Sequence, residues 1–260
     1  MTATTSTTIT ENGAAAANHQ NDTLPVPNPT LSYWREKPHR LDTHRSTPDL
    51  PASCDVVIIG AGLAGVSVAY HLATSPSPPS STLLLDARQL CSGATGRNGG
   101  HVKTKTATLL SLPDPRAASA LDAFVRAQIA ALAAVVTNTN TEPPGLAAEC
   151  EFQLRRSWDV WVRVADAAAV ESEWKSGSEV ERVWTGIMGS TPDGFPHVGK
   201  VPGEQNQWIL AGFNGGGNAL VFLCAKAIAK MVLEGVPFEE TGVDIPAMFK
   251  TTEERLAKHS

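Results

Sequence analysis

Cysteine is scarce in this sequence, and the thiols lie far apart. The four cysteines, Cys54, Cys91, Cys150 and Cys224, include no CxxC pair and no cluster with the spacing of metal ligands. This pattern predicts neither a metal site nor a disulfide framework. We therefore expect reduced thiols in an intracellular compartment, where disulfides are rare.

Signals for export, for membranes and for nucleic acids are missing as well. The start, MTATTSTTITENGAAAANHQ, has neither the basic region nor the apolar core of a secretory signal, and the end, AKHS, differs from the SKL-type peroxisomal signal. We expect no segment that could span a bilayer, and the net charge of −5 without a basic run argues against nucleic-acid binding. The expectation is a cytoplasmic protein that binds neither membranes nor nucleic acids.

A strand, a glycine turn and a helix are predicted where the sequence reads CDVVIIGAGLAGVSVAYHLA. Residues 55–59 are a short apolar run, typical of a buried strand of a parallel sheet, and helical character extends over residues 63–73. Between them, Gly60 and Gly62 permit a tight turn close to a pyrophosphate, while Gly65 lets the helix pack on the strand. The N-terminal end of the helix would face the phosphates, because its N–H groups are unpaired and partly positive.

A second strand over residues 82–85 ends at Asp86, about twenty residues beyond the last glycine of the turn. A carboxylate at this position accepts hydrogen bonds from the ribose hydroxyls of a dinucleotide, and it disfavours the ribose phosphate of NADP. Strand, turn, helix, strand and acidic end together favour a dinucleotide-binding βαβ unit. A purely structural βαβ unit is the alternative.

A second glycine-rich loop, CSGATGRNGGH at residues 91–101, indicates which dinucleotide is bound. Nicotinamide enzymes have no general need for such a loop just past the acidic strand. FAD is longer, and the serine, threonine, arginine and asparagine side chains of the loop offer further donors to its pyrophosphate and ring. The loop therefore favours FAD, while an NAD enzyme with incidental glycine loops stays open as an alternative.

A third glycine cluster, GFNGGGN, follows a strand-like segment at residues 208–211 and precedes a helix expected over residues 219–234. Asn218 is placed to cap this helix, and Gly235 followed by Pro237 is placed to end it. A glycine cluster at a helix N-terminus can set several N–H groups against the pyrimidine side of a flavin, where negative charge develops on reduction.

The other segments carry simpler predictions. The pattern of residues 114–137 predicts a long amphipathic core helix with Pro115 in its first turn. The alternation in WDVWVRV predicts a half-exposed strand at residues 158–164, and a short acidic helix is expected over residues 165–175. Residues 1–30 are polar, without apolar periodicity, and are expected to be disordered.

The motifs GAGLAG, LLLDA and SGATGRNGGH together resemble those of the D-amino-acid-oxidase-like superfamily of flavoproteins. The segment SGATGRNGG and the leader SYWREKPHRLDTHRSTPDLP are similar to those of its gamma-glutamylputrescine oxidoreductase branch. The resemblance implies an α/β fold in which a Rossmann-like FAD-binding domain, built from βαβ units around a parallel sheet, lies beside a substrate domain. It implies FAD as the cofactor.

The resemblance also gives the later part of the chain a role. In the family, a closing segment of this kind packs under the isoalloxazine ring, and the matching residues here are Trp184, Gly186, Thr191, Asp193, Gly194, Pro196, Gly199, Gly212, Phe213, Gly215 and Gly217. Only the start of the substrate domain has a counterpart, so the second domain is expected to be truncated. The expected organisation is a tail (1–30), an extended arm (31–53), the first FAD-binding segment (54–137), a remnant of the substrate domain (138–180), the closing FAD-binding segment (181–240) and a C-terminal tail (241–260).

The candidate cofactor-binding residues come from the three glycine loops and the acidic strand end. They are Gly60, Gly62, Leu63, Ala64, Gly65, Asp86, Ala87, Ser92, Gly93, Ala94, Thr95, Arg97, Asn98, Gly99, Gly100, Gly212, Phe213, Asn214, Gly215, Gly216 and Gly217. His101 is the catalytic candidate, with a structural hydrogen bond as the alternative role. A covalent flavin link through Cys91 or Cys224 is disfavoured, because a small buried side chain is the simpler interpretation of each.

The function that the resemblance implies is oxidation of a small amine or amino-acid-like substrate. The flavin would accept a hydride from the carbon next to the nitrogen, the imine would hydrolyse to a carbonyl compound, and oxygen is the expected electron acceptor. The alternative is a shortened paralogue of weak or no activity with a binding or structural role, because a flavin ring needs walls on both faces. The sequence leaves the substrate and the oligomeric state open.

Overall fold

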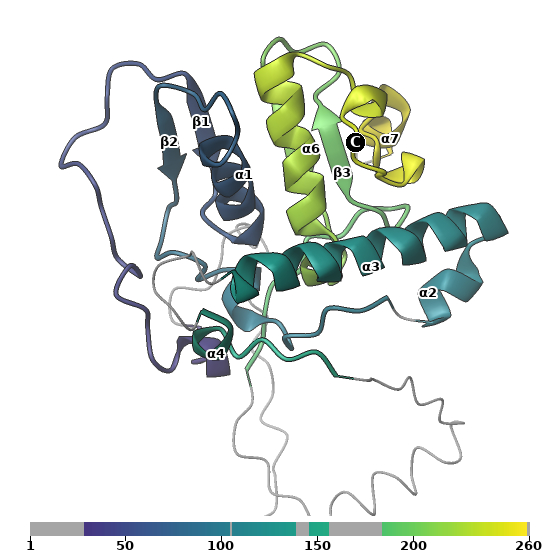
Figure 1. Cartoon of the computed structure of the whole chain (residues 1–260), viewed down its shortest axis with the longest axis horizontal. Helices are drawn as coiled ribbons and strands as arrows, with labels where there is room; N and C mark the ends of the chain where they lie inside the picture. Colours follow the sequence, from purple (N-terminus) through teal and green to yellow (C-terminus); the bar gives the residue numbers. More distant parts are fainter. Residues whose placement is uncertain (1–28, 105, 139–145, 156–183, 259–260) are drawn as a thin grey trace, which may run out of the picture.

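The computed structural model describes residues 29–104, 106–138, 146–155 and 184–258. Within these ranges the strands form two separate two-stranded sheets, one parallel and one antiparallel (Figure 1). The elements in chain order are η1 (Tyr33–Arg35), β1 (Val56–Ile59), α1 (Leu63–Ala73), β2 (Thr82–Leu85), η2 (Ala94–Arg97), α2 (Thr106–Ser111), α3 (Pro115–Thr137), α4 (Leu146–Glu149), β3 (His197–Lys200), β4 (Trp208–Ala211), η3 (Gly217–Ala219), α6 (Val221–Glu234), η4 (Phe238–Glu240), η5 (Ala247–Phe249) and α7 (Glu253–Ala257). The prediction of an α/β fold with a parallel sheet is confirmed in this form.

β1, α1 and β2 form the predicted βαβ unit. The two strands pair in parallel, with Val56 opposite Thr82 and Ile59 opposite Leu85. The predicted bounds of the helix and of the second strand agree with the structure, and the first strand begins one residue later than expected. Because the strands are parallel, their carboxyl ends lie at the same edge, which places Asp86 beside the first glycine turn.

The first strand is less buried than its apolar sequence suggests. Ile58 is buried beneath α1, but Val57 is 51% exposed and Ile59 is 88% exposed. Helix α1 covers one face of the sheet, and the second face is open over the described residues. The prediction of a buried strand was therefore wrong for half of its side chains, because burial on both faces needs a second covering layer.

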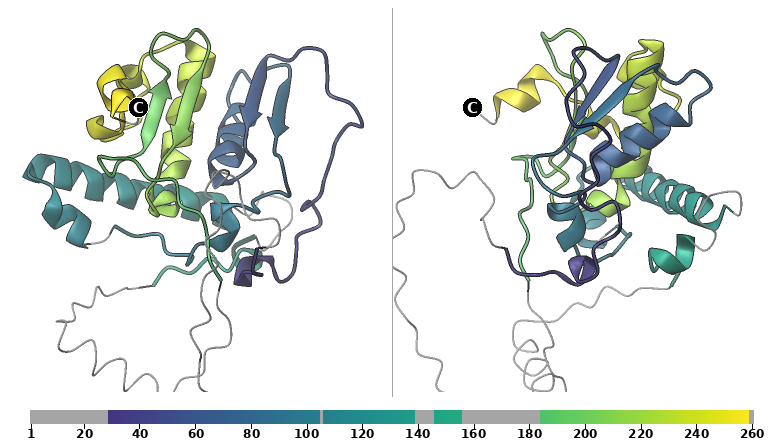
Figure 2. Two further views of the ribbon diagram at one scale, coloured as in Figure 1. Left: turned by 180° about the vertical axis from the view of Figure 1, so that it is seen from behind. Right: turned by 90° about the vertical axis from the view of Figure 1, so that its left-hand side faces the viewer.

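β3 and β4 form the antiparallel sheet, which lies on the other side of α6 from α1 (Figures 1 and 2). His197 is paired with Ala211 across the two strands. β4 matches the strand expected at residues 208–211, whereas β3 was not expected, because its sequence HVGK has no apolar alternation. Val198 in β3 is nevertheless fully buried against the core.

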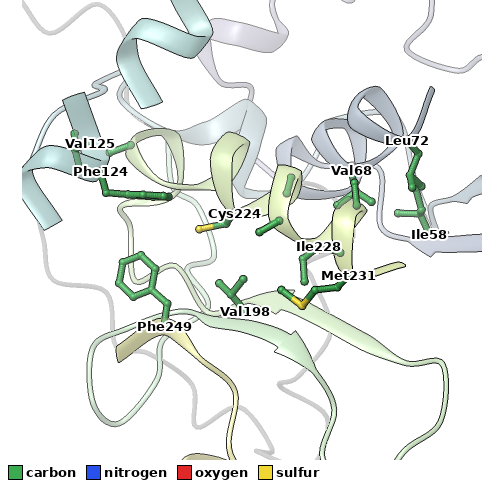
Figure 3. Packing of buried hydrophobic residues seen from close by; sticks show 14 of the residues in the cluster. Ile58, Val68, Leu72, Phe124, Val125, Val198, Cys224, Ile228, Met231 and Phe249 are labelled. Carbon is green, nitrogen blue, oxygen red and sulfur yellow. The ribbon is translucent and has the colours of Figure 1, made fainter. Parts of the chain in front are cut away.

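Helix α6 is the centre of the hydrophobic core (Figure 3). Cys224 and Ala225 are fully inaccessible, and Ile228 follows on the same helix. Val68 and Leu72 of α1 pack against α6, which joins the parallel sheet to the antiparallel one. Since alanines and Cys224 are small, the two helices can approach closely.

Helix α6 begins two residues later than predicted, and Asn218 does not cap it. The short turn η3 comes first, and α6 starts at Val221 without a side-chain cap. Instead, the N–H of Leu223 in the first turn donates to Oε1 of Gln128 on α3, at 2.8 Å. A distant side chain thus satisfies one of the open N–H groups at the start of the helix. The predicted stop is confirmed, since Gly235 has the left-handed φ of 68°.

Helix α3 has the predicted bounds and the predicted start, with the Asp114 carboxylate accepting from the N–H of Arg116. Leu121, Phe124 and Val125 pack into the core. By length and composition alone, α3 is long and apolar enough to cross a membrane, so the expectation that no segment would pass this test was wrong. Its many alanines raise the mean hydropathy without forming a continuous run of large apolar side chains.

The C-terminal residues after α6 pack against the same core and against β3. Phe249 is fully buried, and its neighbour Lys250 forms a parallel bridge with Val198. Figure 2 shows the C-terminal elements η5 and α7, in yellow, on the outer side of the antiparallel sheet. The strand expected at residues 158–164 and the helix expected at 165–175 lie outside the described residues, as does the N-terminal tail up to residue 28. The division into domains stays a prediction.

Arg255 on α7 fastens this C-terminal segment to the turn before β3. Its guanidinium forms a two-pronged pair with Asp193, at 2.7 Å (Nε to Oδ2) and 3.1 Å (Nη2 to Oδ1). It also donates to the carbonyl oxygens of Phe195, Pro196 and Lys250. The side chain is only 12% exposed, so these bonds are partly shielded from water.

The Arg255 guanidinium holds the pKa of the Asp193 carboxyl far below its ordinary value. A carboxyl with a lower pKa in the folded than in the unfolded chain stabilises the fold above its unfolded pKa of about 4, and the contribution is lost as the pH falls further. We therefore expect Asp193→Asn to lower the free energy of unfolding by about 1.5 kcal/mol at about pH 7. The difference should shrink below about pH 4, as measured by urea unfolding.

Glu239→Gln is the control for this experiment. Glu239 also pairs with Lys250, but its side chain is largely in solvent, so its removal should have no measurable effect. An equal loss of stability in Asp193→Asn at neutral and at acid pH would contradict the charge-based explanation.

Candidate functional site

The first glycine turn has the geometry of a tight strand-to-helix turn. Gly60 has a φ of 102°, which L side chains rarely adopt, and its N–H donates to the carbonyl of Leu85 at 2.7 Å. A Cβ on Gly65 would lie 1.9 Å from the carbonyl oxygen of Gly60, so α1 packs directly on the turn. The turn and packing roles predicted for Gly60 and Gly65 are confirmed. Gly62 is the N-cap of α1.

Asp86, at the end of β2, ties that strand to the glycine turn. Its Oδ2 accepts a hydrogen bond from the N–H of Ala61 at 2.7 Å, and its Oδ1 accepts from the N–H of Arg88 at 2.8 Å. Each carboxylate oxygen can accept a second hydrogen bond. Asp86 therefore has a structural role and still has lone pairs for a ligand.

The second glycine loop lies on the N-terminus of α1. Oγ1 of Thr95 accepts a hydrogen bond from the N–H of Leu63 at 2.8 Å. At the start of the loop, the N–H of Cys91 donates to the carbonyl of Ala61 at 3.0 Å. The second loop is thus anchored to the first turn at two points.

The second loop is also joined to the third. Oδ1 of Asn98 accepts from Nδ2 of Asn218 at 3.0 Å and from the N–H of Gly100 at 2.6 Å. The carbonyl of Asn218 in turn accepts from Nε2 of Gln128 at 3.1 Å. Gln128 is fully buried on α3, so the core helix holds the third loop in place.

The guanidinium of Arg97, in the second loop, donates hydrogen bonds to other parts of the protein. Its guanidinium donates to the carbonyl and the hydroxyl of Thr30, at 2.6 and 2.9 Å, and to the carbonyl of Thr185. The indole N–H of Trp184 donates to the carbonyl of Arg97 at 3.0 Å. Arg97 therefore connects Thr30, just before the arm, with the second loop and the closing segment.

All three glycine loops line one cavity of about 1110 Å³. Of the predicted cofactor-binding residues, its wall contains Gly62, Leu63, Ala64, Asp86, Ser92, Gly93, Ala94, Thr95, Arg97, Asn98, Gly99, Gly212, Phe213, Asn214, Gly215, Gly216 and Gly217. His101, the catalytic candidate, lies on the same wall. The third loop thus lines the same cavity as Gly62, Leu63 and Ala64 at the start of α1.

A smaller cavity of about 720 Å³ adjoins the large one along Asp86, Arg88, Ser92 and Arg97, which line both. The predicted residues Gly60 and Ala87 lie on its wall, together with Ile59, Leu85 and part of the arm.

Two predicted residues, Gly65 and Gly100, line neither cavity. Gly65 is packed against the first turn, and Gly100 is packed against the Trp34 ring.

Positive charge predominates on the wall of the large cavity. Its lining includes three cationic residues, Arg88, Arg97 and Lys103, and one carboxylate, that of Asp86. Such a balance raises the local concentration of anionic ligands. Among the described residues, no group of three or more His, Cys, Asp or Glu side chains is placed to hold a metal ion.

Neither cysteine considered for a flavin link lines either of these two cavities. Sγ of Cys91 lies 3.5 Å from the carbonyl of Ala61, and burial raises the pKa of its thiol. Cys224 lies in the core, where burial raises its pKa even more. Both are structural side chains, since a thiol held neutral is a poor nucleophile.

Sequence reasoning missed several residues of the cavity wall. Arg88 follows Asp86 by two positions and could have been found from that spacing, whereas Lys103, Thr104 and residues 187–189 carry no local signal. Oγ1 of Thr104 is buried without a hydrogen-bond partner in the described structure. A buried hydroxyl without a partner is unfavourable, and a ligand atom in the cavity would supply one.

Comparison with known proteins identifies the family. Residues 55–179 and 163–231 match the family described as FAD dependent oxidoreductase. No curated protein and no solved structure gives a significant match. The two matched ranges together span residues 55–231, more than half of the 260 residues, and contain all three glycine loops. The chain therefore belongs to the FAD-dependent oxidoreductases, a family that uses FAD as its cofactor.

Proposed function

We propose that one FAD molecule spans the two adjoining cavities and that the chain oxidises a small amine or amino-acid-like substrate. One observation carries this proposal: the three glycine loops line one cavity and are hydrogen-bonded to one another. If the second and third loops were incidental, as the NAD interpretation requires, they would have no need to line the same cavity as the first turn. Their convergence supports a long cofactor with two ends.

We place the pyrophosphate at the start of α1. The N–H of Leu63 is taken by Thr95, but the N–H of Ala64 has no acceptor within the helix. Ala64 lines the large cavity, and Gly62 has no side chain to block the approach. The helix dipole and the nearby Arg88 add positive potential at this point.

We place the adenosine end in the smaller cavity. Asp86 stands where the two cavities meet, and each of its oxygens can accept one further hydrogen bond, as ribose hydroxyls require. A phosphate on that ribose would be repelled by the same carboxylate. This arrangement favours FAD over a phosphorylated dinucleotide.

We place the flavin end at the third loop, in the large cavity. Leu220 and Val221 at the N-terminal end of α6 also line this cavity, so the partial positive charge of that helix end faces the space. When bound, FAD supplies the hydride acceptor that converts an amine to an imine, and it passes the electrons on to oxygen. The glycine N–H groups and the helix end stabilise negative charge, and the neighbouring apolar residues exclude water.

The substrate would enter beside the closing segment. Ile187 and Met188 lie on the cavity wall and are largely exposed, which offers apolar contacts to an incoming amine. His101 and Lys103 supply polar groups on the same wall. These residues would orient a substrate, whose identity a fold does not determine.

A visible spectrum of gently purified protein is the first test. We expect flavin absorbance, either as purified or after incubation with FAD. Protein that shows none under either condition contradicts the proposal, and a parallel titration with NADH tests the NAD interpretation. Oxygen uptake that depends on an added amine, with formation of peroxide, tests the reaction.

A second candidate function is binding or structural, with weak or no turnover. The open face of the β1–β2 sheet favours it, because Val57 and Ile59 are exposed and Ile59 borders the smaller cavity. An exposed apolar sheet face of this kind is also expected in a chain whose partner covers that face. Protein that binds FAD without amine-dependent oxygen uptake supports this candidate, and measured turnover rules it out.

A further inference from the structure

The arm that precedes β1 holds the start and the middle of the second glycine loop. Ser32 is fully buried, and its hydroxyl donates to the carbonyl of Gly96. Nη1 of Arg35 donates to the carbonyl of Leu90 at 3.0 Å, while Nη2 pairs with Asp42 at 2.8 Å. Because Asp42 fixes the guanidinium, Arg35 holds the loop from a defined position.

Trp34, between these two residues, holds the end of the loop. Its Nε1 donates to the carbonyl of Asn98 at 2.7 Å. Its ring lies against Gly100, where a Cβ would come within 2.8 Å of Cζ2. Gly100 has a φ of 73°, so the loop bends sharply where the ring covers it.

Through Asn98, the contact with Trp34 reaches the other two glycine loops. The side chain of Asn98 accepts from Asn218 of the third loop and donates to the carbonyl of Thr95. Thr95 accepts from the N–H of Leu63 at the first turn. The backbone position of Asn98 therefore decides whether its side chain meets both neighbours.

We propose that Trp34 is a positioning residue: its indole N–H fixes the carbonyl of Asn98 and sets the loop in the cofactor-binding conformation before FAD arrives. This inference rests on the proposed function, in which the loops hold one FAD. Trp34 lines neither cavity, so it acts through Asn98. The loop is rich in glycine, and ordering it in advance removes an entropic cost from binding.

Trp34→Phe tests this role, because phenylalanine keeps an aromatic ring at position 34 and lacks the N–H donor. We expect the dissociation constant for FAD, measured by fluorescence titration, to rise roughly tenfold, which is about 1.4 kcal/mol. Amide hydrogen exchange over residues 92–100 of the apoprotein should become faster. The melting temperature of the apoprotein should stay close to that of the wild type, since Trp34 is partly exposed.

Tyr33→Phe is the matched control. Tyr33 is on the same short turn, but its hydroxyl donates to the carboxylate of Glu151 at 3.1 Å and not to the loop. This variant should change neither FAD affinity nor loop exchange. Trp34→His, whose ring can again donate an N–H, should recover part of the affinity.

Two results separate this inference from the proposed function. If the wild type binds FAD and Trp34→Phe shows the same affinity and the same loop exchange, the positioning role is overturned and the proposed function stands. If the wild type itself binds no FAD, both are overturned.

Discussion

Gly62→Asp should abolish FAD binding and leave the fold intact. Gly62 is the N-cap of α1, with φ −81° and ψ −174°, a conformation open to any L residue. Aspartate is among the best residues at an N-cap. The added Cβ would meet one atom within 4 Å, Oγ1 of Thr95 at 3.1 Å, and that side chain can shift slightly. The stability of the apoprotein should therefore change little.

The effect on the cofactor follows from charge. The new carboxylate would lie at the end of α1 where we place the pyrophosphate. Two like unit charges about 5 Å apart repel by about 3 kcal/mol at an effective dielectric constant of about 20. The affinity for FAD should fall at least roughly a hundredfold, as measured by equilibrium dialysis and by loss of the yellow colour.

Gly62→Asn separates charge from size. Asparagine has nearly the same shape and is an equally good N-cap, but it is neutral. We expect a much smaller loss of FAD affinity. Equal losses in the two variants would point to steric exclusion, and a folded Gly62→Asp protein with wild-type affinity would show that the pyrophosphate lies elsewhere.

Gly65→Ala should destabilise the protein strongly, although alanine is the better helix former. The new Cβ would lie 1.9 Å from the carbonyl oxygen of Gly60 and 3.1 Å from Cγ2 of Ile58. The oxygen belongs to the backbone and cannot rotate away, so α1 would have to move off β1. That movement would disturb the packing of Val68 and Leu72 against α6.

We expect Gly65→Ala to lower the free energy of unfolding by about 3 kcal/mol, the upper end of the usual range for overpacking. For a chain of this size, that corresponds to roughly 6–12 °C in melting temperature. Gly189→Ala is the control, because its Cβ would make only an ordinary contact at 3.7 Å with Cα of Gly212. A Gly65→Ala protein as stable as the wild type would mean that α1 does not pack on the turn as described.

The sequence predicted the elements that short-range patterns control. The βαβ unit, the bounds of α1, β2, α3 and β4, and the stop at Gly235 follow from apolar periodicity and from glycine and proline positions. Each of these depends on residues a few positions apart. The same holds for the turn at Gly60, whose positive φ only glycine adopts readily.

The predictions that failed concern contacts between distant segments. Asn218 has good capping chemistry, but its side-chain amide donates to Asn98. The N–H of Leu223 at the start of α6 donates instead to Gln128 of α3. The burial of β1 depends on a covering layer that its own residues do not encode. Strand β3 has no strand-like pattern and exists because β4 and the core hold it.

By itself, the sequence determined three glycine loops with the local chemistry to hold a dinucleotide, because turns and helix starts depend on neighbouring residues. Tertiary structure alone decided that the loops share one cavity, since Thr95, Asn98 and Gln128 bring together segments that lie far apart in the chain. It also decided that Arg97 and the arm brace the second loop. Such contacts depend on how the core packs α1, α3 and α6, and no local pattern contains that information.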